Sequence, residues 1–303
     1  MRARTLAWWV ALGVLLVAAP FLLSGFRLRL LTEVLIFGLF AASLDLLLGF
    51  TGLVSLGHAL FFGVGAYTAA LVANQVTPQP LVLLVAAVVV AALVAVVTGA
   101  LAVRARGVFF LMLTLAFGQL AFSLAESWTP VTGGANGLPL PTLPLLSGVV
   151  PFYYYALAAF AVGYAALRRV VDSPFGRSLV GVRENEARMR AVGYDVRGVK
   201  LAAYVVAGAF AGFAGALYAQ QQRFVSPGLV GFETAALVLV MVILGGRGTL
   251  VGPVLGAGVV LLLRDELSAR FERWQLLLGL VFILVVYLLP RGLAGLRRPR
   301  TAS

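Results

Sequence analysis

The sequence predicts an all-α membrane protein with about ten transmembrane helices in one domain spanning residues 1–303. Two observations support this fold class. Hydrophobic residues make up 62% of the chain and charged residues 11%, with a mean hydropathy of +1.04. Apolar runs long enough to cross a hydrocarbon layer of about 30 Å also recur along the whole length. Cysteine is absent, which excludes disulfides, thiolate metal sites and cysteine nucleophiles.

Ten segments are predicted to cross the membrane, with ends uncertain by a few residues. They are 6–26, 30–49, 54–74, 81–103, 108–125, 151–167, 201–222, 233–246, 252–264 and 275–290. The first begins like a signal peptide, with basic residues before an apolar core. That core, Leu6–Leu23, is longer than the usual signal core of about 7–15 residues, so a retained helix is predicted.

The basic residues predict the orientation of these helices. If residues 1–5 are cytoplasmic, the segments on that side carry 17 of the 23 Arg and Lys residues and the opposite side carries 6. This bias follows the positive-inside rule and places both termini in the cytoplasm. The net charge of +12 is therefore interpreted as a signal of topology, and no nucleic-acid partner is expected.

Two of the ten segments, 54–74 and 252–264, are predicted to be interrupted helices. Glycine is frequent in SLGHALFFGVGAY and in GGRGTLVGP, where a continuous helix disfavours it. In transporters such interruptions often line the substrate path. The predicted path residues are Ser55, Gly57, His58, Gly245, Gly246 and Gly248. The alternative is close helix packing through small residues such as Gly57, Gly63, Gly252 and Gly256.

Residues 126–150 are predicted to form an exterior loop. Their prolines and the GGANG stretch prevent a continuous helix. The loop is either a docking surface or gate, or a plain connector.

Residues 168–200 form the one strongly polar segment and hold 8 of the 24 Arg, Lys and His residues. A turn is predicted at 172–176. Val182, Met189, Val192, Val196 and Val199 then follow a helical spacing and predict one apolar stripe. Gly193 is expected to interrupt this helix and Asp195 to cap the next one. Glu184 and Glu186 would be repelled by anionic lipid, so a protein partner with a groove is preferred to a lipid surface.

The chain offers little for catalysis or ion coupling. It has no G-x-x-x-x-G-K-[ST] motif, so no ATP is expected to bind to it, and no cofactor is predicted. The sole histidine, His58, lacks the further ligands that a metal needs, and a brace for the broken helix is the preferred role. Asp45 is the deepest acidic residue, which leaves an ion-coupled secondary transporter as a rival.

Four segments, in order, resemble the permeases of branched-chain amino-acid ABC transporters of the LivM type. They are LLLGFTGLVSLGHALFFGVGAYTAAL at 46–71, TLAFGQL with VTGGANGL at 114–138, GRSLVGVRENEARMRAVGYDVRGVKLAAYVVAGAFAGFAGALYA starting at residue 176, and LVMVILGGRGTLVGPVLGA at 239–257. The resemblance covers about residues 30–290. It implies a non-enzymatic permease subunit in the bacterial inner membrane, with lipid around it.

The resemblance also implies which residues meet a cytoplasmic ATPase. Glu186, Ala187 and Gly193 match the loose Glu-Ala-Ala…Gly pattern of importer coupling loops, although Arg188 replaces the second Ala. With the amphipathic pattern, the predicted coupling residues are Glu184, Glu186, Ala187, Met189, Val192 and Gly193.

The partners implied are a related, LivH-like permease, two ATPase subunits that bind ATP, and an extracytoplasmic binding protein. The same machine for urea, short amides or a sugar is the alternative. A membrane-embedded enzyme would need clustered nucleophile and base residues, which one histidine disfavours.

Overall fold

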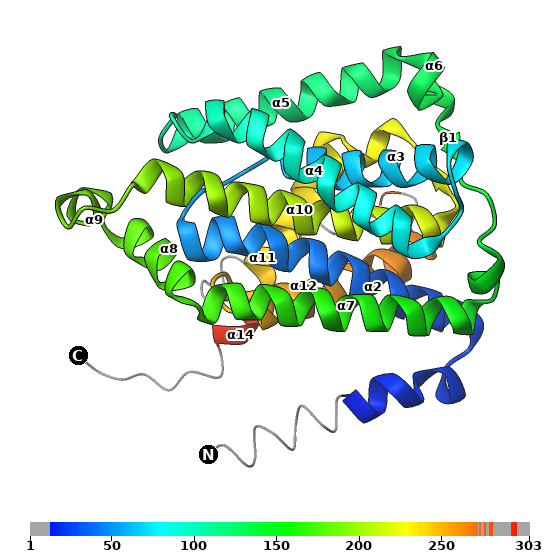
Figure 1. Ribbon diagram of the computed structural model, residues 1–303. Helices are drawn as coiled ribbons and strands as arrows, with labels where there is room; N and C mark the ends of the chain where they lie inside the picture. The colour runs from blue at the N-terminus through cyan, green and yellow to red at the C-terminus, as the bar shows by residue number, and fades with distance from the viewer. Residues whose placement is uncertain (1–12, 272, 274–275, 277–278, 281–291, 296–303) are drawn as a thin grey trace.

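The computed structural model describes residues 13–271, 273, 276, 279–280 and 292–295 (Figure 1). The described chain is almost entirely helical. The longer helices are Gly13–Leu22, α2 (Gly25–Asp45), α3 (Ala59–Gln75), α4 (Pro80–Ala102), α5 (Val108–Ser127), α7 (Val149–Asp172), α8 (Pro174–Glu184), α10 (Val196–Gln222), α11 (Phe232–Gly245) and α12 (Val251–Ser268). The short elements are the π-helix η1 (Leu46–Thr51), α6 (Thr129–Thr132), η2 (Gly134–Asn136), β1 (Leu138–Pro139), η3 (Pro144–Leu146), α9 (Glu186–Ala191), β2 (Phe224–Val225), η4 (Pro227–Leu229) and α14 (Gly292–Gly295).

Six helical stretches among the described residues are long and apolar enough to cross a membrane. They are Gly25–Thr51, Pro80–Ala102, Val108–Ser127, Val149–Asp172, Val196–Gln222 and Pro227–Gly245. The apolar helices Gly13–Leu22 and α3 are shorter. The chain is therefore an all-α polytopic membrane protein, as predicted. The predicted helix 275–290 lies almost wholly outside the described residues.

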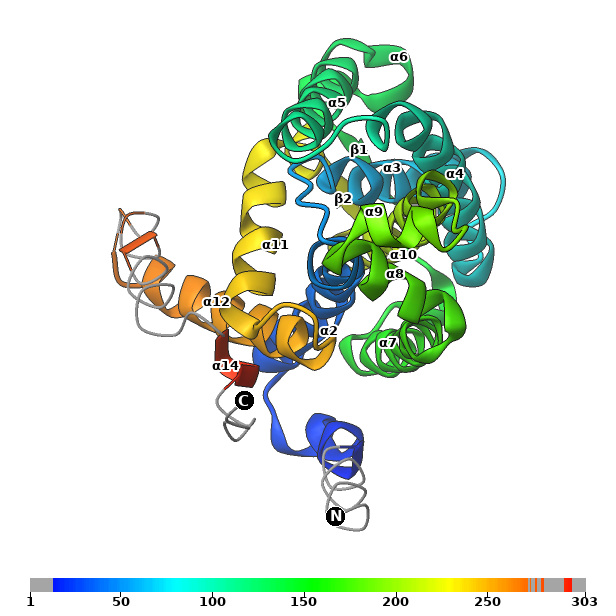
Figure 2. The ribbon, with the colours of Figure 1, turned by 90° about the vertical axis from the view of Figure 1, so that its left-hand side faces the viewer.

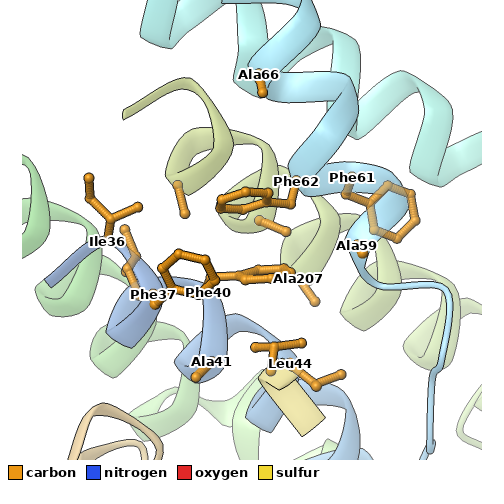
Figure 3. Close-up of a cluster of buried hydrophobic side chains, with 14 of the residues drawn as sticks. Ile36, Phe37, Phe40, Ala41, Leu44, Ala59, Phe61, Phe62, Ala66 and Ala207 are labelled. Carbon is orange, nitrogen blue, oxygen red and sulfur yellow. The ribbon is translucent and has the colours of Figure 1, made fainter. Parts of the chain in front are cut away.

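Helix α2 is the centre of the bundle. Viewed from the α8–α9 end, it lies between α7, α10, α11 and α12 (Figure 2). Every residue from Leu35 to Gly49 is buried, so this stretch is surrounded on all sides. Phe37 and Phe40 point toward Phe62 of α3 (Figure 3), and the Phe40 and Phe62 ring centroids lie 4.4 Å apart.

Small residues let α10 approach α3 and α4 closely. A Cβ atom on Gly215 would overlap the carbonyl oxygen of Phe62, and one on Gly65 would overlap that of Gly212. Such contacts replace the hydrophobic driving force that lipid does not supply between helices.

The first predicted interruption is confirmed, but its helical boundary was wrong. The segment 54–74 was expected to be helical from its start, whereas residues 52–58 are irregular and α3 begins only at Ala59. These residues run back beside α2 and α5, and Leu56 N donates to Thr114 Oγ1 over 3.3 Å. A Cβ atom on Gly57 would overlap the Thr114 carbonyl oxygen. Irregular backbone at membrane depth is tolerated because protein surrounds it.

The second predicted interruption lies before its helix and not within it. Helix α12 is continuous from Val251, and the break is the connection 246–250, with positive φ at Gly246, Gly248 and Leu250. Within α12, a Cβ atom on Gly256 would overlap the Met241 carbonyl oxygen of α11. The close helix packing considered for 252–264 is therefore present at Gly256.

The predicted exterior loop 126–150 is folded and, as expected, is not one helix. It contains α6, η2, β1 and η3, and β1 pairs antiparallel with β2 through Leu138↔Val225 and Pro139↔Phe224. Leu140 N also donates to Arg223 O over 2.9 Å. The pairing fixes the loop to the end of α10, and we call this the β1–β2 end of the bundle.

The contact of α10 with α3 predicts that Gly215→Val lowers stability. The added side chain would meet the backbone of Phe62, and overpacking of this kind costs about 1–3 kcal/mol. We expect a lower thermal midpoint for the detergent-purified protein by circular dichroism. Gly25→Ala is the control, since no atom lies within 4 Å of the added Cβ. Equal midpoints for both variants would contradict this packing.

Candidate functional site

The carboxylate of Asp45, at the end of α2, holds the connection between α11 and α12. Its Oδ1 accepts a hydrogen bond from Gly248 N at 2.6 Å, and its Oδ2 accepts from Thr249 N at 3.2 Å and Leu250 N at 3.1 Å. Asp45 is fully buried. The first N–H groups of a helix lack intrahelical partners, and here a distant carboxylate supplies acceptors just ahead of α12.

Arg183 joins the polar segment to the same place. Its Nη1 donates to the carbonyl oxygen of Gly49 in η1. An ideal Cβ on Gly248 would lie 3.6 Å from that Nη1, and a side chain at Gly49 would collide with both Asp45 and Gly248. Asp45, Gly49, Arg183 and Gly248 therefore form one cluster, which we call the hinge cluster.

His58 fastens the irregular segment 52–58 to α2, which agrees with the bracing role preferred from the sequence. Its Nε2 lies 2.9 Å from Ser43 Oγ, and its ring stacks on Phe40 with centroids 5.5 Å apart. The ring is fully buried, and neither its Nδ1 nor the Ser55 hydroxyl has a hydrogen-bond partner among the described residues.

The structure thus places the predicted path residues in two groups that meet α2 within one turn. The first group, Ser55, Gly57 and His58, reaches α2 through the His58 side chain, which contacts Ser43. Gly245, Gly246 and Gly248 belong to the α11–α12 connection, which reaches α2 at Asp45. Residues two apart on a helix point in different directions, so the two interruptions hold α2 from different sides.

The polar segment 168–200 folds into two short helices and the start of α10, each with a side-chain cap. Ser173 Oγ accepts from Gly176 N, Asn185 Oδ1 from Arg188 N, and Asp195 Oδ1 from Arg197 N. The turn near 172–176 and the Asp195 cap were both predicted. Gly193 has φ +94°, which confirms the predicted break, because L side chains rarely adopt that conformation.

The predicted single apolar stripe is wrong. Asn185 ends α8 and starts α9, so the residues on either side of it belong to different helices. Val182 and Val196 are buried in the bundle, whereas Val192 is 71% exposed. Met189 is turned toward α8, where a Cβ on Gly181 would lie 2.7 Å from its sulfur.

Glu186 faces the bundle and not a free surface. It forms an ion pair with Lys200, whose side chain is 4% exposed, and a second pair with Arg190 at 3.1 Å. The pair fastens α9 to the start of α10. Of the predicted coupling residues, Glu184, Ala187, Val192 and Gly193 are exposed.

Sequence reasoning missed Arg183, Asn185, Tyr194 and Lys200. Lys200 is the only lysine of the chain and Asn185 lies between two glutamates, so both carried a signal. Arg183 carried none, because its partner is a backbone carbonyl 134 positions earlier.

A buried central helix held by two interrupted segments is an arrangement found in membrane transport proteins. The chain matches the family model described as "Branched-chain amino acid transport system / permease component" over residues 26–286. It is 32% identical to the high-affinity branched-chain amino acid transport permease LivM of Escherichia coli, covering 96% of this chain and 75% of that protein. It is 25% identical to a probable LivM of Methanocaldococcus jannaschii, covering 85% and 90%. No solved structure matches the chain.

The chain therefore belongs to the family of branched-chain amino acid transport permease components, as the sequence motifs predicted. A shorter alignment, 37% identical over 42% of this chain, links it to the autoinducer 2 import permease LsrC of Klebsiella pneumoniae.

The hinge cluster predicts that Asp45→Asn destabilises the protein. An amide has one acceptor oxygen in place of two and presents its own N–H groups to buried N–H donors, which costs about 1–3 kcal/mol. We expect a lower thermal midpoint. Asp172→Asn is the control, because its pair with Arg168 is more than half exposed and contributes little. If Asp45→Asn kept full stability but abolished uptake, an ion-coupling role would replace the structural one.

The Glu186–Lys200 pair predicts a local effect on α9. Glu186→Gln leaves the buried ammonium of Lys200 without a carboxylate, at a cost of about 1–3 kcal/mol. Hydrogen exchange of the amides in α9 should become faster, while exchange in α3 stays unchanged. Glu184→Gln, on the neighbouring exposed position, is the matched control. Unchanged exchange in α9 would show that the pair does not hold the helix.

Proposed function

We propose that this chain is one permease subunit of an ABC importer that moves branched-chain or other hydrophobic amino acids inward. Family membership carries this proposal, supported by the similarity to LivM proteins over nearly the whole chain. Two separate cytoplasmic ATPase subunits would bind and hydrolyse ATP. A related, LivH-like permease and an extracytoplasmic binding protein would complete the importer. The chain itself performs no covalent chemistry and needs no cofactor.

The proposed orientation has ten spans in the bacterial inner membrane, with both termini in the cytoplasm. The α8–α9 end carries the polar segment 168–200, and the β1–β2 end carries the folded loop 126–150 (Figure 1). Because basic residues accumulate on the cytoplasmic side, the α8–α9 end would face the ATPases. The β1–β2 end would then face the binding protein.

The ATPase contact is proposed on the outer face of α8 and α9. Val192 is 71% and Tyr194 49% exposed, next to Gly193, and Glu184 and Ala187 are exposed beside them. An apolar and aromatic pair rimmed by charges is typical of a docking surface. Glu186 and Met189 would act from behind by holding α9 in place.

Movement of α8 would reach the interrupted segments through Arg183. This side chain leaves the C-terminal turn of α8 and binds Gly49, one turn after Asp45. A displacement of α8 by the ATPase would pull on η1 and on the α11–α12 connection together. Rigid helices moving about such connections are the common form of alternating access.

Three alternatives are less well supported. An ion-coupled transporter would need a carboxylate free to take up an ion, whereas Asp45 accepts three backbone hydrogen bonds. A sugar-like cargo is suggested only by alignments to LsrC and to a ribose permease, each covering less than half of this chain. Urea and short amides remain as related cargoes of the same machinery.

The docking surface predicts that Val192→Asp and Tyr194→Ala weaken binding of the ATPase subunits. Truncating an aromatic anchor costs about 2 kcal/mol or more, roughly a thirtyfold loss of affinity. The measurement is the amount of ATPase that co-purifies with the tagged permease, together with ATP-dependent leucine uptake in proteoliposomes.

Phe224→Ala is the matched control for that experiment. This aromatic residue is similarly exposed, at 45%, but lies in β2 at the other end of the bundle. It should leave ATPase binding unchanged. If no ATPase co-purifies with the wild-type chain, the importer proposal fails.

A further inference from the structure

A cavity of about 490 Å³ opens at the β1–β2 end, away from the hinge cluster. It lies among the start of α2, η3 and the start of α7, the end of α10 and the end of α12. In Figure 1, α2 and α7 begin at the right-hand end, while α8 and α9 lie at the left. The volume is that of a small-molecule site.

Charged groups of both signs line this cavity. Arg29 and Arg223 contribute guanidinium groups, and Glu33 and Asp265 contribute carboxylates. Glu33 is partly engaged by Arg264, with Nη1 and Oε1 3.8 Å apart. Within the described part of the chain, no hydrogen bond or ion pair engages the Asp265 carboxylate.

The backbone conformation at the end of α10 places the charged Arg223 side chain at the cavity. Arg223 has φ +55°, a conformation that a residue other than glycine rarely adopts. Its Nη2 donates to Ser147 O at 3.1 Å, which fixes the guanidinium beside the start of α7. Gln221 Nε2 donates to Arg29 O at 2.9 Å and holds the first turn of α2 against α10. An unusual backbone conformation at a cavity wall is frequently functional.

The buried side-chain amide of Gln220 is the feature that indicates a ligand. Its side chain lines the cavity and the residue is 3% exposed, yet neither amide atom has a partner at hydrogen-bonding distance within the described structure. The Tyr155 hydroxyl lies beside this amide and donates to Pro80 O, at 3.2 Å. A buried amide without partners costs free energy, so a bound polar group would satisfy it.

The remaining wall is apolar. Phe26, Leu30, Val149 and Phe152 provide hydrocarbon surface beside the charged groups. A ligand that satisfies this lining must carry an anionic group, a cationic group and an apolar part within a few ångströms of one another.

We propose that this cavity binds a zwitterionic amino acid with an apolar side chain, as an entry site between the binding protein and the interrupted helices. The inference rests on the proposed function and adds a site to it. The α-carboxylate would lie toward Arg29 and Arg223, and the ammonium group toward Asp265 and Glu33. The Gln220 amide, which protein atoms enclose in this structure, would turn toward the ligand and hydrogen-bond it, and the hydrocarbon would pack on Phe152.

The test measures binding of radiolabelled L-leucine to the tagged permease in nanodiscs, together with the subunits that co-purify with it and without binding protein. Leucinamide lacks the carboxylate, and 4-methylpentanoate lacks the ammonium group. Each should compete at least about tenfold more weakly than L-leucine, because one charged hydrogen-bonding partner is lost. Gln220→Leu and Asp265→Asn should each weaken leucine binding by about tenfold.

Two matched variants control for indirect effects. Gln79→Leu changes an exposed glutamine at the start of α4, and Arg270→Gln changes an exposed arginine paired with Glu266. Both should bind leucine like the wild type. Arg29→Gln, at an exposed position, is a further binding variant if Gln220→Leu does not fold.

Three results would overturn the site: no leucine binding, competition by the two analogues as strong as that by L-leucine, or wild-type affinity in the cavity variants. These results are separate from failure of the proposed function. If leucine does not bind but ATPase subunits still co-purify and drive uptake, only the entry site fails. If leucine binds with the stated analogue ranking but no ATPase co-purifies, the importer proposal fails and the site stands.

Discussion

The three hydrogen bonds accepted by Asp45 are the constraint on which the rest of the bundle depends. Helix α12 begins in the interior, after a connection whose N–H groups have no helical partners. Water would normally satisfy them, but Asp45 is fully buried at this point. A carboxylate on the continuous helix α2 solves the problem and fixes where α12 starts. The interruption is therefore stable only because α2 is not interrupted there.

This dependence explains the unusual end of α2. After Asp45 the helix widens into the π-helix η1, and π-turns are frequent at functional sites. The wider turn brings Gly49 against Gly248 and leaves its carbonyl oxygen to Arg183. Residues 45–49 thus bind the α11–α12 connection through the Asp45 side chain and the polar segment through the Gly49 carbonyl oxygen.

The sequence allowed prediction of what depends on local pattern. The length of the apolar runs predicted the long helices, and the frequent glycines predicted the two interruptions near Gly57 and Gly248. Capping chemistry also placed Asp195 correctly. What could not be predicted depends on contacts between distant residues. Asp45 was seen as a possible ion-coupling group because its three partners lie more than 200 positions away. Glu186 was assigned to an external groove because its pairing with Lys200 requires the break at Asn185.

Helices α2 and α12 run antiparallel and are fastened at both ends by acids of α2. Glu33 near the start of α2 meets Arg264 near the end of α12, and Asp45 at the end of α2 meets the start of α12. At 1.5 Å per residue, the 21 residues of α2 extend about 31 Å, close to the thickness of a hydrocarbon layer. A pair held at both ends would move as one body. Arg183 acts at one end of that body and the cavity containing Glu33 and Asp265 lies at the other. A shift of α8 would therefore change the entry cavity without any contact between them.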